Sequence, residues 1–397
     1  MFLRAILRFT RYSTLPLSNQ QRHASILSSL NSSPVLVSSN KDIYTNLALE
    51  HWLYNNLRFD SSASPNDKNI SQTPIVLIWT DEPCVVIGRH QNPWIESTLG
   101  FVNKAGIKLA RRHSGGGCVY HDENNINISI IGDRKLFDRR QDNLKFLASV
   151  LLDKYGIKCE PTKRHDLVHL PTGLKMSGSA AKLGRTNSYH HFTLLVDTDK
   201  EVMETAIRQK PQDSIQTNSS SSIRSKVINL KDINGDLTVE QVMTDLVQAY
   251  NDHYKSNRKS EARQSTIQGD QDDLSSLDSF RQELASWKWI YGMTPKFKIE
   301  KSITFLEKDQ EKLIKLVVDV NRGLFEKVSI DGELSEKFRH GKFDHLVGTR
   351  FTYKDSMLNI VQTLKEDEAE LQQSGFMAGE EQIFTTLLLQ IVQEANL

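Results

Sequence analysis

Two short apolar segments separated by only four residues set the strongest constraint on the fold. Residues 74–79 read Pro-Ile-Val-Leu-Ile-Trp, residues 84–88 read Cys-Val-Val-Ile-Gly, and Thr-Asp-Glu-Pro lies between them. Both segments are rich in β-branched residues, which favours strands. A short connection that contains proline predicts that the two strands pair as a hairpin.

Periodic patterns elsewhere predict a mixture of helices and strands. Residues 43–57 carry apolar side chains at near-helical spacing without proline or glycine, which predicts a first helix. Further strands are expected at 126–131 and 190–196, helices at 143–155 and 239–254, alternating strands at 297–305, 312–320 and 325–330, and a last helix at 382–395. Together these elements predict the α+β fold class.

A polar segment divides the chain of 397 residues, a length that suits two or three domains. Residues 256–278 are serine-rich and contain no aromatic side chain, which is typical of an interdomain linker. We expect a large domain over 40–255, a linker over 256–279 and a smaller α+β domain over 280–397.

Composition excludes several classes of protein. Hydrophobic residues make up 38% and charged residues 25% of the chain, which argues against wholesale disorder. No apolar run is long enough to span a bilayer. The formal net charge of +1 gives no reason to expect nucleic-acid binding. Cys84, Cys118 and Cys159 are widely spaced, which argues against a structural zinc site or a disulfide framework and indicates a reducing compartment.

The N-terminal segment differs from the rest of the chain in charge. It carries four arginines among many serines, and no acidic residue precedes Asp42. The first nine residues read as a short basic amphipathic helix, and an acid-free start of this kind is typical of a mitochondrial transit peptide. The alternative is an ordinary basic tail. We expect residues 1–35 to be a transit peptide and the mature protein to lie in the mitochondrial matrix.

The most unusual stretch is Arg111-Arg112-His113-Ser114-Gly115-Gly116-Gly117-Cys118-Val119-Tyr120-His121-Asp122. Three consecutive glycines cost conformational entropy, and one usually suffices for a turn. Three are explained if a group approaches the backbone closely, or if successive N–H groups form an anion-binding nest. The flanking arginines could each bind a carboxylate or phosphate through two hydrogen bonds. The alternative is a surface turn with solvated arginines, and the pattern alone leaves both open.

A second unusual stretch surrounds Lys175. It begins at Lys163-Arg164-His165-Asp166-Leu167 and continues with Gly173-Leu174-Lys175-Met176-Ser177-Gly178-Ser179-Ala180-Ala181. Five of the six residues after Lys175 are small, so a ligand could lie against the chain beside the ammonium. A lysine in this position can stabilise negative charge that develops in acyl or phosphoryl transfer. The alternative, which composition alone favours, is a solvated lysine at a strand edge.

Two adjacent histidines, His190 and His191, precede an apolar run. Adjacent residues of a strand point to opposite faces, so the pair cannot readily bind one metal ion. No HExxH pattern lies nearby. We therefore expect a structural or orienting role and no metal site. Cys118 is expected to be a small buried thiol, because the sequence pairs it with no base.

Taken together, the motifs resemble one family. The chain contains, in that family's order and spacing, the segments GRHQNPW at 88–94, RRHSGGGCVYHD, KRHDL, KMSGSA and HHFTLL. SIRSKVINL at 222–230 and WKWIYGMTPKF at 287–297 are also similar. These segments resemble the lipoate–protein ligase A and lipoyltransferase family over residues 40–300. With its N-terminal segment, the chain looks most like the mitochondrial lipoyltransferases.

This resemblance implies a fold, an activity and partners. The family fold is a mixed β-sheet flanked by helices, shared with biotin–protein ligases, with a small C-terminal accessory domain. Family members hold lipoyl-AMP and transfer the lipoyl or octanoyl group to a lysine of a lipoyl-domain protein. The implied acceptors are E2 subunits of 2-oxoacid dehydrogenases and the glycine-cleavage H protein. Neither nucleic acid nor a membrane is an implied partner, and the chain is expected to be a monomer.

The resemblance also assigns roles to residues. Lys175 is the implied catalytic residue, which bridges the mixed anhydride and the phosphate. Arg112 and the glycine run are implied to line the acyl tunnel, and Ile223 and Ser225 to lie on a loop that closes over the nucleotide. The implied lipoyl-AMP-binding residues are Arg112, Ser114, Gly115, Gly116, Gly117, Cys118, Val119, Tyr120, Arg164, Thr193, Ile223 and Ser225.

Three positions depart from the bacterial ligase pattern. His165 replaces a common Asn, Phe192 a common Gly, and Cys118 a small Ala or Thr. These changes favour a transferase that uses lipoyl-AMP. One alternative is a full ligase that makes the adenylate from lipoate and ATP, with Mg²⁺ for that step. Another is a non-catalytic lipoyl-domain-binding protein, against which the presence of Lys175 argues. The sequence leaves the acyl donor open, and it lacks the Gly-Arg-Gly motif of biotin ligases.

Overall fold

The structure, a computed structural model, describes residues 34–59, 73–207, 215–256, 272–307, 310–332 and 344–352. The predicted helix at 382–395 and nearly all of the predicted transit peptide lie outside these residues. The chain forms two compact units that alternate along the sequence. The first unit spans 1–89, 108–204 and 222–286, and the second spans 90–107, 205–221 and 287–397. The sequence analysis expected a single boundary at 256–279, and its assignment of functional domains stays a prediction.

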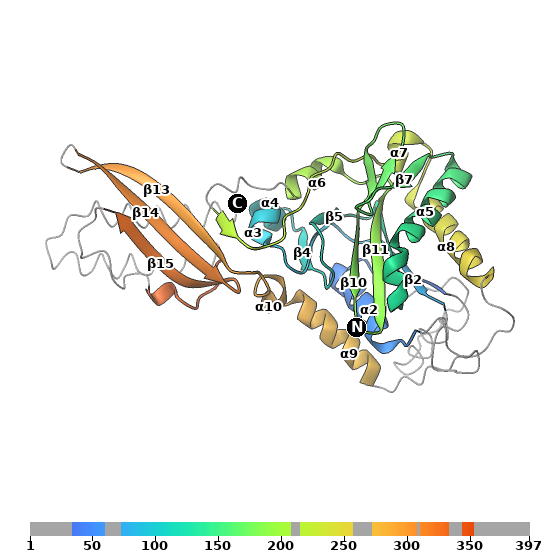
Figure 1. Ribbon diagram of the computed structural model, residues 1–397, viewed down its shortest axis with the longest axis horizontal. Helices are drawn as coiled ribbons and strands as arrows, with labels where there is room; N and C mark the ends of the chain where they lie inside the picture. The colour runs from blue at the N-terminus through green and yellow to red at the C-terminus, as the bar shows by residue number, and fades with distance from the viewer. Residues whose placement is uncertain are drawn as a thin grey trace. The chain divides into compact units, whose positions relative to one another are not determined.

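A five-stranded mixed sheet forms the centre of the first unit (Figure 1). Its strands, in spatial order, are β1 (Val35–Val37), β2 (Ile75–Trp79), β6 (Asn125–Asp133), β11 (Asn187–Leu195) and β10 (Ser179–Leu183). β1 and β2 are parallel and the other pairs are antiparallel. The strands predicted at 126–131 and 190–196 are confirmed by β6 and β11.

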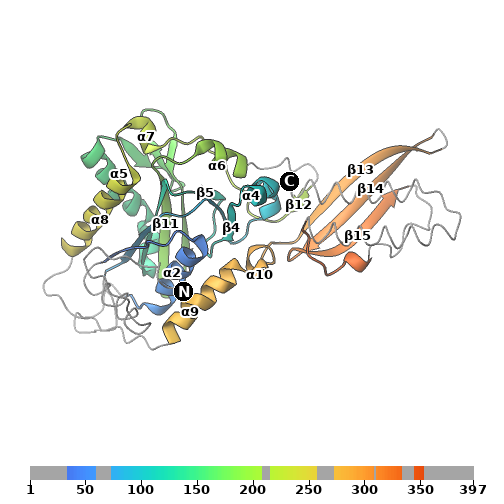
Figure 2. The ribbon, with the colours of Figure 1, turned by 180° about the vertical axis from the view of Figure 1, so that it is seen from behind.

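Helices cover both faces of this sheet. α5 (Arg140–Tyr155) and α8 (Val239–Ser256) lie side by side on one face (Figures 1 and 2), where alternate strand residues such as Ile126, Ile128 and Ile130 pack against them. Successive strand residues point to opposite faces. Tyr189 and His191 therefore face the other way, toward α2 (Ile43–Asn56). The helices predicted at 43–57, 143–155 and 239–254 are confirmed.

Two three-stranded sheets complete the first unit. The first has the order β4-β3-β5, with β3 (Cys84–Ile87), β4 (Lys108–Arg111) and β5 (Val119–His121); the second has the order β7-β8-β9, with β7 (Cys159–Pro161), β8 (Leu167–His169) and β9 (Lys175–Ser177). The predicted hairpin is wrong, because β2 and β3 enter different sheets. Each is a central strand with partners on both edges, so neither has an edge left to pair with the other.

The first unit also contains shorter helices and one helix that begins within the predicted linker. These are η2 (Arg134–Arg139), α6 (Lys200–Ala206, which ends in the second unit), α7 (Leu230–Ile233) and α9 (Asp272–Ala285). α9 begins inside the segment predicted as linker, and it packs against α2. Among the described helices, none combines the length and the hydropathy needed to cross a bilayer.

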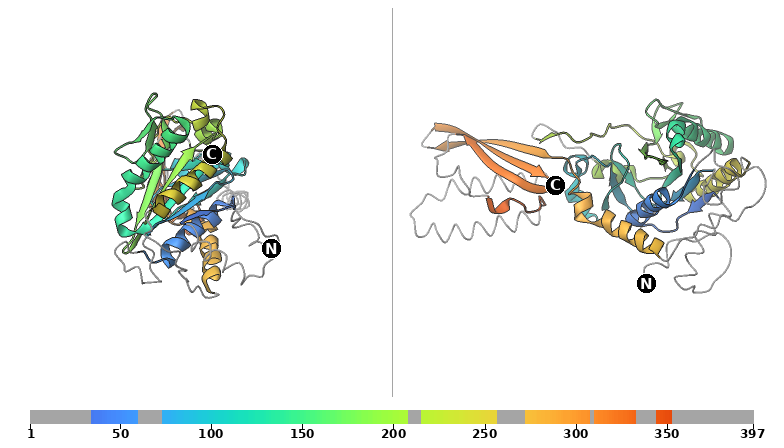
Figure 3. Two further views of the ribbon diagram at one scale, coloured as in Figure 1. Left: turned by 90° about the vertical axis from the view of Figure 1, so that its right-hand side faces the viewer. Right: turned by 60° about the horizontal axis from the view of Figure 1, so that its bottom comes forward.

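The second unit is built on an antiparallel sheet in the order β12-β13-β14-β15 (Figure 3). Its elements are α3 (Pro93–Glu96), α4 (Leu99–Lys104), β12 (Ile215–Thr217), α10 (Trp287–Ile290), β13 (Phe297–Glu307), β14 (Gln310–Asn321), β15 (Leu324–Gly332) and η4 (Asp344–Leu346). The three predicted C-terminal strands are confirmed by β13, β14 and β15. Trp94 lies at the centre of its core, with the rings of Tyr291, Phe297 and Phe351 around it.

Candidate active site

The glycine loop, Ser114–Cys118, connects β4 and β5 and is organised by one buried arginine. The Arg112 guanidinium donates from Nη2 to the carbonyl oxygens of Gly115 and Gly117, each at 2.7 Å, and from Nη1 to that of Val86 at 3.0 Å. Its Nε donates to Ser114 Oγ at 2.9 Å. Burial lowers the pKa of Arg112. This arginine therefore holds the loop in shape and directs these donors to the protein itself.

A chain of hydrogen bonds leads from this arginine to a buried acid. Ser114 Oγ lies 2.9 Å from His191 Nε2, and His191 Nδ1 lies 2.8 Å from Glu50 Oε1. Since a guanidinium only donates and a carboxylate only accepts, Ser114 donates to His191 and His191 donates to Glu50. Burial raises the pKa of Glu50, but His191, Ser129 and His51 together outweigh burial and lower this pKa. The orienting role predicted for His191 agrees with this geometry, and His190 points to the opposite face toward Asn143.

The glycines are required because the chain packs closely on itself. A Cβ at Gly88 would lie 2.2 Å from the Gly116 carbonyl oxygen, and one at Gly117 would lie 3.2 Å from Ser222 Oγ. Gly116 has φ +89°, a left-handed conformation that favours glycine. A Cβ at Gly115, by contrast, would meet no atom within 4 Å. The loop is thus closely packed against Gly88 and Ser222 and open beside Gly115.

Two stacked histidines adjoin the glycine loop. His113 stacks on His51 of α2 with ring centroids 3.6 Å apart, and Phe280 of α9 meets His51 edge-on. Burial lowers the pKa of His51 to about 4 and that of His113 to about 2. Both rings are therefore neutral near pH 7.

Lys175 lines a separate cavity of about 570 Å³ in the first unit. Its Nζ forms an ion pair with Asp166 Oδ1 at 2.8 Å. The cavity is lined by Thr162, Lys163, Arg164, Asp166, Val168, Gly173, Leu174, Lys175, Ser225 and Lys226. Of the predicted site residues, Lys175, Arg164 and Ser225 are brought together here. Four cationic side chains and one carboxylate line this cavity, which suits an anionic ligand.

The position of the Lys175 ammonium depends on Gly178. A Cβ at Gly178 would lie 3.1 Å from both Cε and Nζ of Lys175. The Gly178 N–H donates to Thr193 Oγ1 at 3.1 Å, and the Thr193 N–H donates to the Gly178 carbonyl at 3.0 Å. Gly178, one of the small residues that follow Lys175, therefore makes room for the Lys175 side chain itself. Thr193, expected to contact the adenylate, holds the backbone at Gly178.

The other predicted residues lie at the glycine loop or near it. The Cys118 N–H donates to Ser222 Oγ at 2.8 Å, and Val119 and Tyr120 pair with β3. Tyr120 is buried, which raises its pKa. Ile223 is 64% exposed. None of these residues lines the Lys175 cavity.

The sequence analysis missed two acids. Asp166 was quoted only as part of KRHDL, although it is an acid between a basic pair and a strand. Glu50 is a lone carboxylate on an otherwise apolar part of a predicted helix. A carboxylate on the buried face of a helix requires a partner. The position of Glu50 could therefore have been singled out from the sequence.

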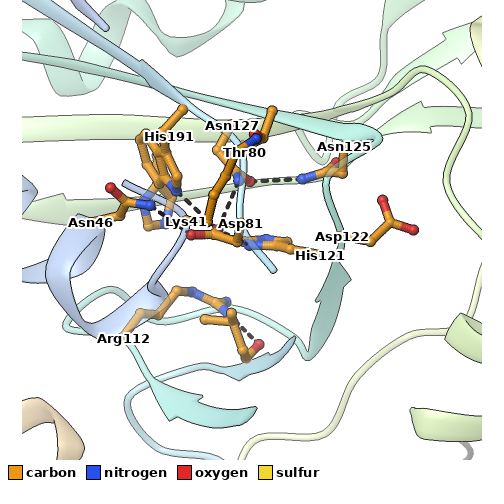
Figure 4. Close-up of polar contacts among 12 residues, drawn as sticks. Lys41, Asn46, Thr80, Asp81, Arg112, His121, Asp122, Asn125, Asn127 and His191 are labelled. Carbon is orange, nitrogen blue, oxygen red and sulfur yellow. Dashed lines mark hydrogen bonds and ion pairs between the residues drawn. The ribbon is translucent and has the colours of Figure 1, made fainter. Parts of the chain in front are cut away.

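Asp81 forms a further buried polar cluster beside the glycine loop (Figure 4). Its Oδ1 accepts from Asn46 at 2.8 Å, and its Oδ2 accepts from Trp79, His121 and Asn127, each at 3.0 Å. Asp81, Cys84 and His121 offer three metal-ligand atoms within 4.8 Å of one another. Both carboxylate oxygens are already hydrogen-bonded, however, so this cluster serves as a junction between α2, β2, β5 and β6.

Comparison with known proteins places these features in one family. Residues 42–251 match the lipoyl protein ligase A/B catalytic domain. The chain is 36% identical over 321 residues to the human mitochondrial lipoyl amidotransferase LIPT1, covering 80% of this chain and 82% of that protein. It is 31% identical over 265 residues to lipoate-protein ligase A of Bdellovibrio bacteriovorus, covering 66% and 73%.

A solved structure supports the fold. P. falciparum LipL1, determined in complex with lipoate, superposes with a TM-score of 0.50 at 23% identity, covering 90% of this chain and 99% of that one. This likeness confirms the predicted α+β fold of the lipoate ligase type. On the match of its catalytic region and the length of its alignment with the human amidotransferase, the chain belongs to the lipoyl protein ligase A/B family.

Proposed function

We propose that this chain is a lipoyltransferase that moves a lipoyl or octanoyl group from lipoyl-AMP to a lysine of lipoyl-domain proteins. The observation that carries the proposal is the cation-lined cavity in which Asp166 holds Lys175. An acyl-adenylate presents an anionic phosphate next to a reactive carbonyl, and Lys163, Arg164 and Lys226 supply the opposite charge.

Lys175 is the proposed catalytic residue. An ammonium has three N–H donors, and Asp166 accepts one of them. Two remain for the carbonyl and phosphate oxygens of the anhydride. Negative charge grows on both oxygens as the acceptor nitrogen attacks, so these hydrogen bonds are stronger in the transition state than in the ground state. Arg164 and Ser225 are proposed to contact the adenylate from the same cavity.

The glycine loop is proposed to bind lipoyl-AMP through its backbone. Arg112 occupies the carbonyl oxygens of Gly115 and Gly117, which favours contacts with the ligand through N–H groups. The open space beside Gly115 is consistent with a ligand there. Cys118, Val119, Tyr120, Thr193 and Ile223 stay proposed binding residues, Thr193 by way of Gly178.

Lipoylation of an isolated apo acceptor domain tests the function. The purified chain is mixed with the domain and either preformed lipoyl-AMP or lipoate plus ATP, and the mass of the domain is measured. We expect a mass increase of one lipoyl group with lipoyl-AMP. A product with lipoate plus ATP as well would make the chain a full ligase, like its relatives named lipoate-protein ligase A. No product from either donor would contradict both enzyme readings and leave the non-catalytic binder.

The proposed acceptors are E2 subunits and the glycine-cleavage H protein, and the proposed compartment is the mitochondrial matrix. The human and mouse relatives are named as mitochondrial proteins. Arg4, Arg8 and Arg11 are spaced for one face of a helix in the acid-free start. A reporter fused to residues 1–40 should enter mitochondria, and replacing these three arginines with glutamate should stop import. A cytosolic unmodified fusion would contradict the targeting proposal.

A further inference from the structure

We propose that Asp166 is a second catalytic group, which accepts the proton that the acceptor lysine must lose before it attacks. This inference rests on the proposed function. An acceptor lysine in water has a pKa of about 10.4 and arrives as an ammonium, which has no lone pair for attack on a carbonyl. A lipoyltransferase therefore needs a route for this proton.

Asp166 lies where this route would begin. Among the described residues it contributes the one carboxylate that lines the Lys175 cavity. Its Oδ1 accepts from Lys175, whereas its Oδ2 has no hydrogen-bond partner among the described residues. The side chain is 15% exposed, and Asp166 lines the cavity. A carboxylate with one oxygen fixed and one available can both orient Lys175 and receive a proton.

The charges around Asp166 assist the transfer. Lys175 on β9 is paired with it, and Lys163, Arg164 and Lys226 line the same cavity. Like charges nearby disfavour an ammonium and lower its pKa. The cations that bind the phosphate thus favour loss of a proton from the incoming lysine. A cavity lined by cations alone would repel the acceptor, and Asp166 offers it an opposite charge.

The turn that carries Asp166 is fixed. The Asp166 N–H donates to Thr162 Oγ1 at 3.2 Å, and the Thr162 N–H donates to the Asp166 carbonyl at 2.7 Å. His165 between them has φ +62° and accepts a hydrogen bond from Ser179 Oγ at 2.6 Å through its carbonyl oxygen. A left-handed conformation in a residue other than glycine persists only where its surroundings enforce it. The carboxylate is therefore held in place before any ligand binds.

The proposed step balances as follows. The acceptor ammonium gives one proton to Asp166, and the resulting amine nitrogen forms a bond with the acyl carbon. The bond between that carbon and the phosphate oxygen breaks, and its electron pair leaves with AMP. The nitrogen loses its second proton to the departing phosphate or to water, which leaves a neutral amide. Asp166 returns its proton to solvent.

A nucleophile that needs no base distinguishes proton acceptance by Asp166 from the positioning of Lys175. Hydroxylamine is largely neutral at pH 7, and it attacks acyl-adenylates to give a hydroxamate. Single-turnover transfer from preformed lipoyl-AMP is measured with the apo acceptor domain and with hydroxylamine. Asp166→Asn should lower transfer to the protein lysine by roughly 10²-fold or more, the usual contribution of a general base, and change hydroxamate formation by less than about threefold. Lys175→Ala should impair both reactions.

Equal losses of Asp166→Asn on both nucleophiles would overturn the proposal, because Asp166 would then act only by positioning Lys175. Normal transfer to the protein lysine would overturn it as well. Asp236→Asn, which neutralises an exposed acid elsewhere in the first unit, is the matched control and should match the unmodified chain. Failure of the proposed function itself would look different, since the unmodified chain would then give no product with the acceptor domain.

Discussion

The glycine loop and the Lys175 cavity use positive charge in opposite ways. At the loop, Arg112 is buried and donates to three backbone carbonyl oxygens and a serine hydroxyl. At the cavity, Lys163, Arg164 and Lys226 line open space, and Lys175 is paired through one of its three donors. The sequence analysis singled out cationic residues in both places. Their hydrogen-bond and ion-pair partners decide which of these cations stabilise the fold and which remain available to a ligand.

This difference predicts that the two regions respond differently to substitution. A change at the exposed cations of the cavity, Lys163, Arg164 and Lys226, should affect catalysis with little effect on folding, because exposed charges contribute little to stability. A change in the loop should affect the free energy of unfolding first, since the side chains of Arg112 and Ser114 that hold it are buried and hydrogen-bonded. The following variants test that separation.

The largest effect is expected for Lys175→Ala. Loss of one charged donor to a developing oxyanion typically costs roughly 10²–10³ in kcat, so single-turnover transfer from saturating lipoyl-AMP should fall by that factor. The circular dichroism spectrum should stay unchanged, which shows that the variant is folded. Lys175→Arg should not restore activity, because a planar guanidinium does not reproduce a compact ammonium. Lys200→Ala, a surface lysine paired with Asp232, is the control. Near-normal turnover of Lys175→Ala would show that Lys175 is not the catalytic residue.

Gly88→Ala should have the next largest effect, on stability. Its Cβ would lie 2.2 Å from the Gly116 carbonyl oxygen, so one of two backbone segments must move. Such overpacking typically costs about 1–3 kcal/mol, measurable by urea denaturation. Gly115→Ala is the matched control, since its Cβ meets open space, and its free energy of unfolding should change by less than about 0.5 kcal/mol. Equal effects of the two variants would show that the loop is not packed as described.

The stacked pair of His51 and His113 should make the free energy of unfolding depend on pH. Burial lowers the pKa of His51 from 6.5 to about 4, so the unfolded chain binds a proton that the folded chain rejects. This contribution is fully present above pH 6.5 and is lost as the pH falls toward 4, by about 1 kcal/mol per pH unit. His51→Phe keeps a ring against His113 and cannot titrate, so its unfolding free energy should vary less between pH 6.5 and 4. Parallel pH curves for the two proteins would contradict this assignment.

The smallest effect is expected for Ser222→Ala. The Ser222 hydroxyl accepts a hydrogen bond from the Cys118 N–H at 2.8 Å. Its removal should lower the free energy of unfolding by about 0.5–1.5 kcal/mol, the usual net value of one hydrogen bond. Ser220→Ala serves as a comparison, because the Ser220 backbone N–H donates to the His90 carbonyl oxygen and this hydrogen bond survives the substitution. An equal loss in both variants would show that the hydroxyl at 222 does not fasten the loop.

Local periodicity was enough to predict most of the long helices and strands, but not the short ones. Helices such as α2 and α5 and long strands such as β6 and β14 carry their pattern within a dozen residues. The pairing of β2 and β3 could not be predicted in this way. Both strands are buried and central, and the partners that take their edges lie up to 56 residues away along the chain.

The candidate site could be predicted in its chemistry but not in its contacts. The sequence analysis singled out Lys175 and the glycine run, the described geometry gives each a defined environment, and their roles stay predictions. The resemblance assigned Arg112 to the acyl tunnel, which stays a prediction; the sequence did not reveal that Arg112 donates to the loop carbonyls. The sequence analysis explained Gly178 by an approaching ligand, whereas the neighbour of Gly178 is Lys175 itself. Such contacts depend on which residues a fold brings together, and a single sequence does not contain that information.

The alternation of the two units along the chain has a consequence for synthesis on the ribosome. The chain passes between the units five times, and Trp94 of the second unit is fully buried among the rings of Tyr291, Phe297 and Phe351. At about 5–20 residues per second, Phe351 emerges roughly 10–50 s after Trp94. Throughout that interval the nascent chain carries an indole without its final neighbours. An N-terminal fragment that ends at residue 286 would carry this exposed surface permanently, so the second unit cannot be removed as a C-terminal module without leaving residues 90–107 and 205–221 stranded.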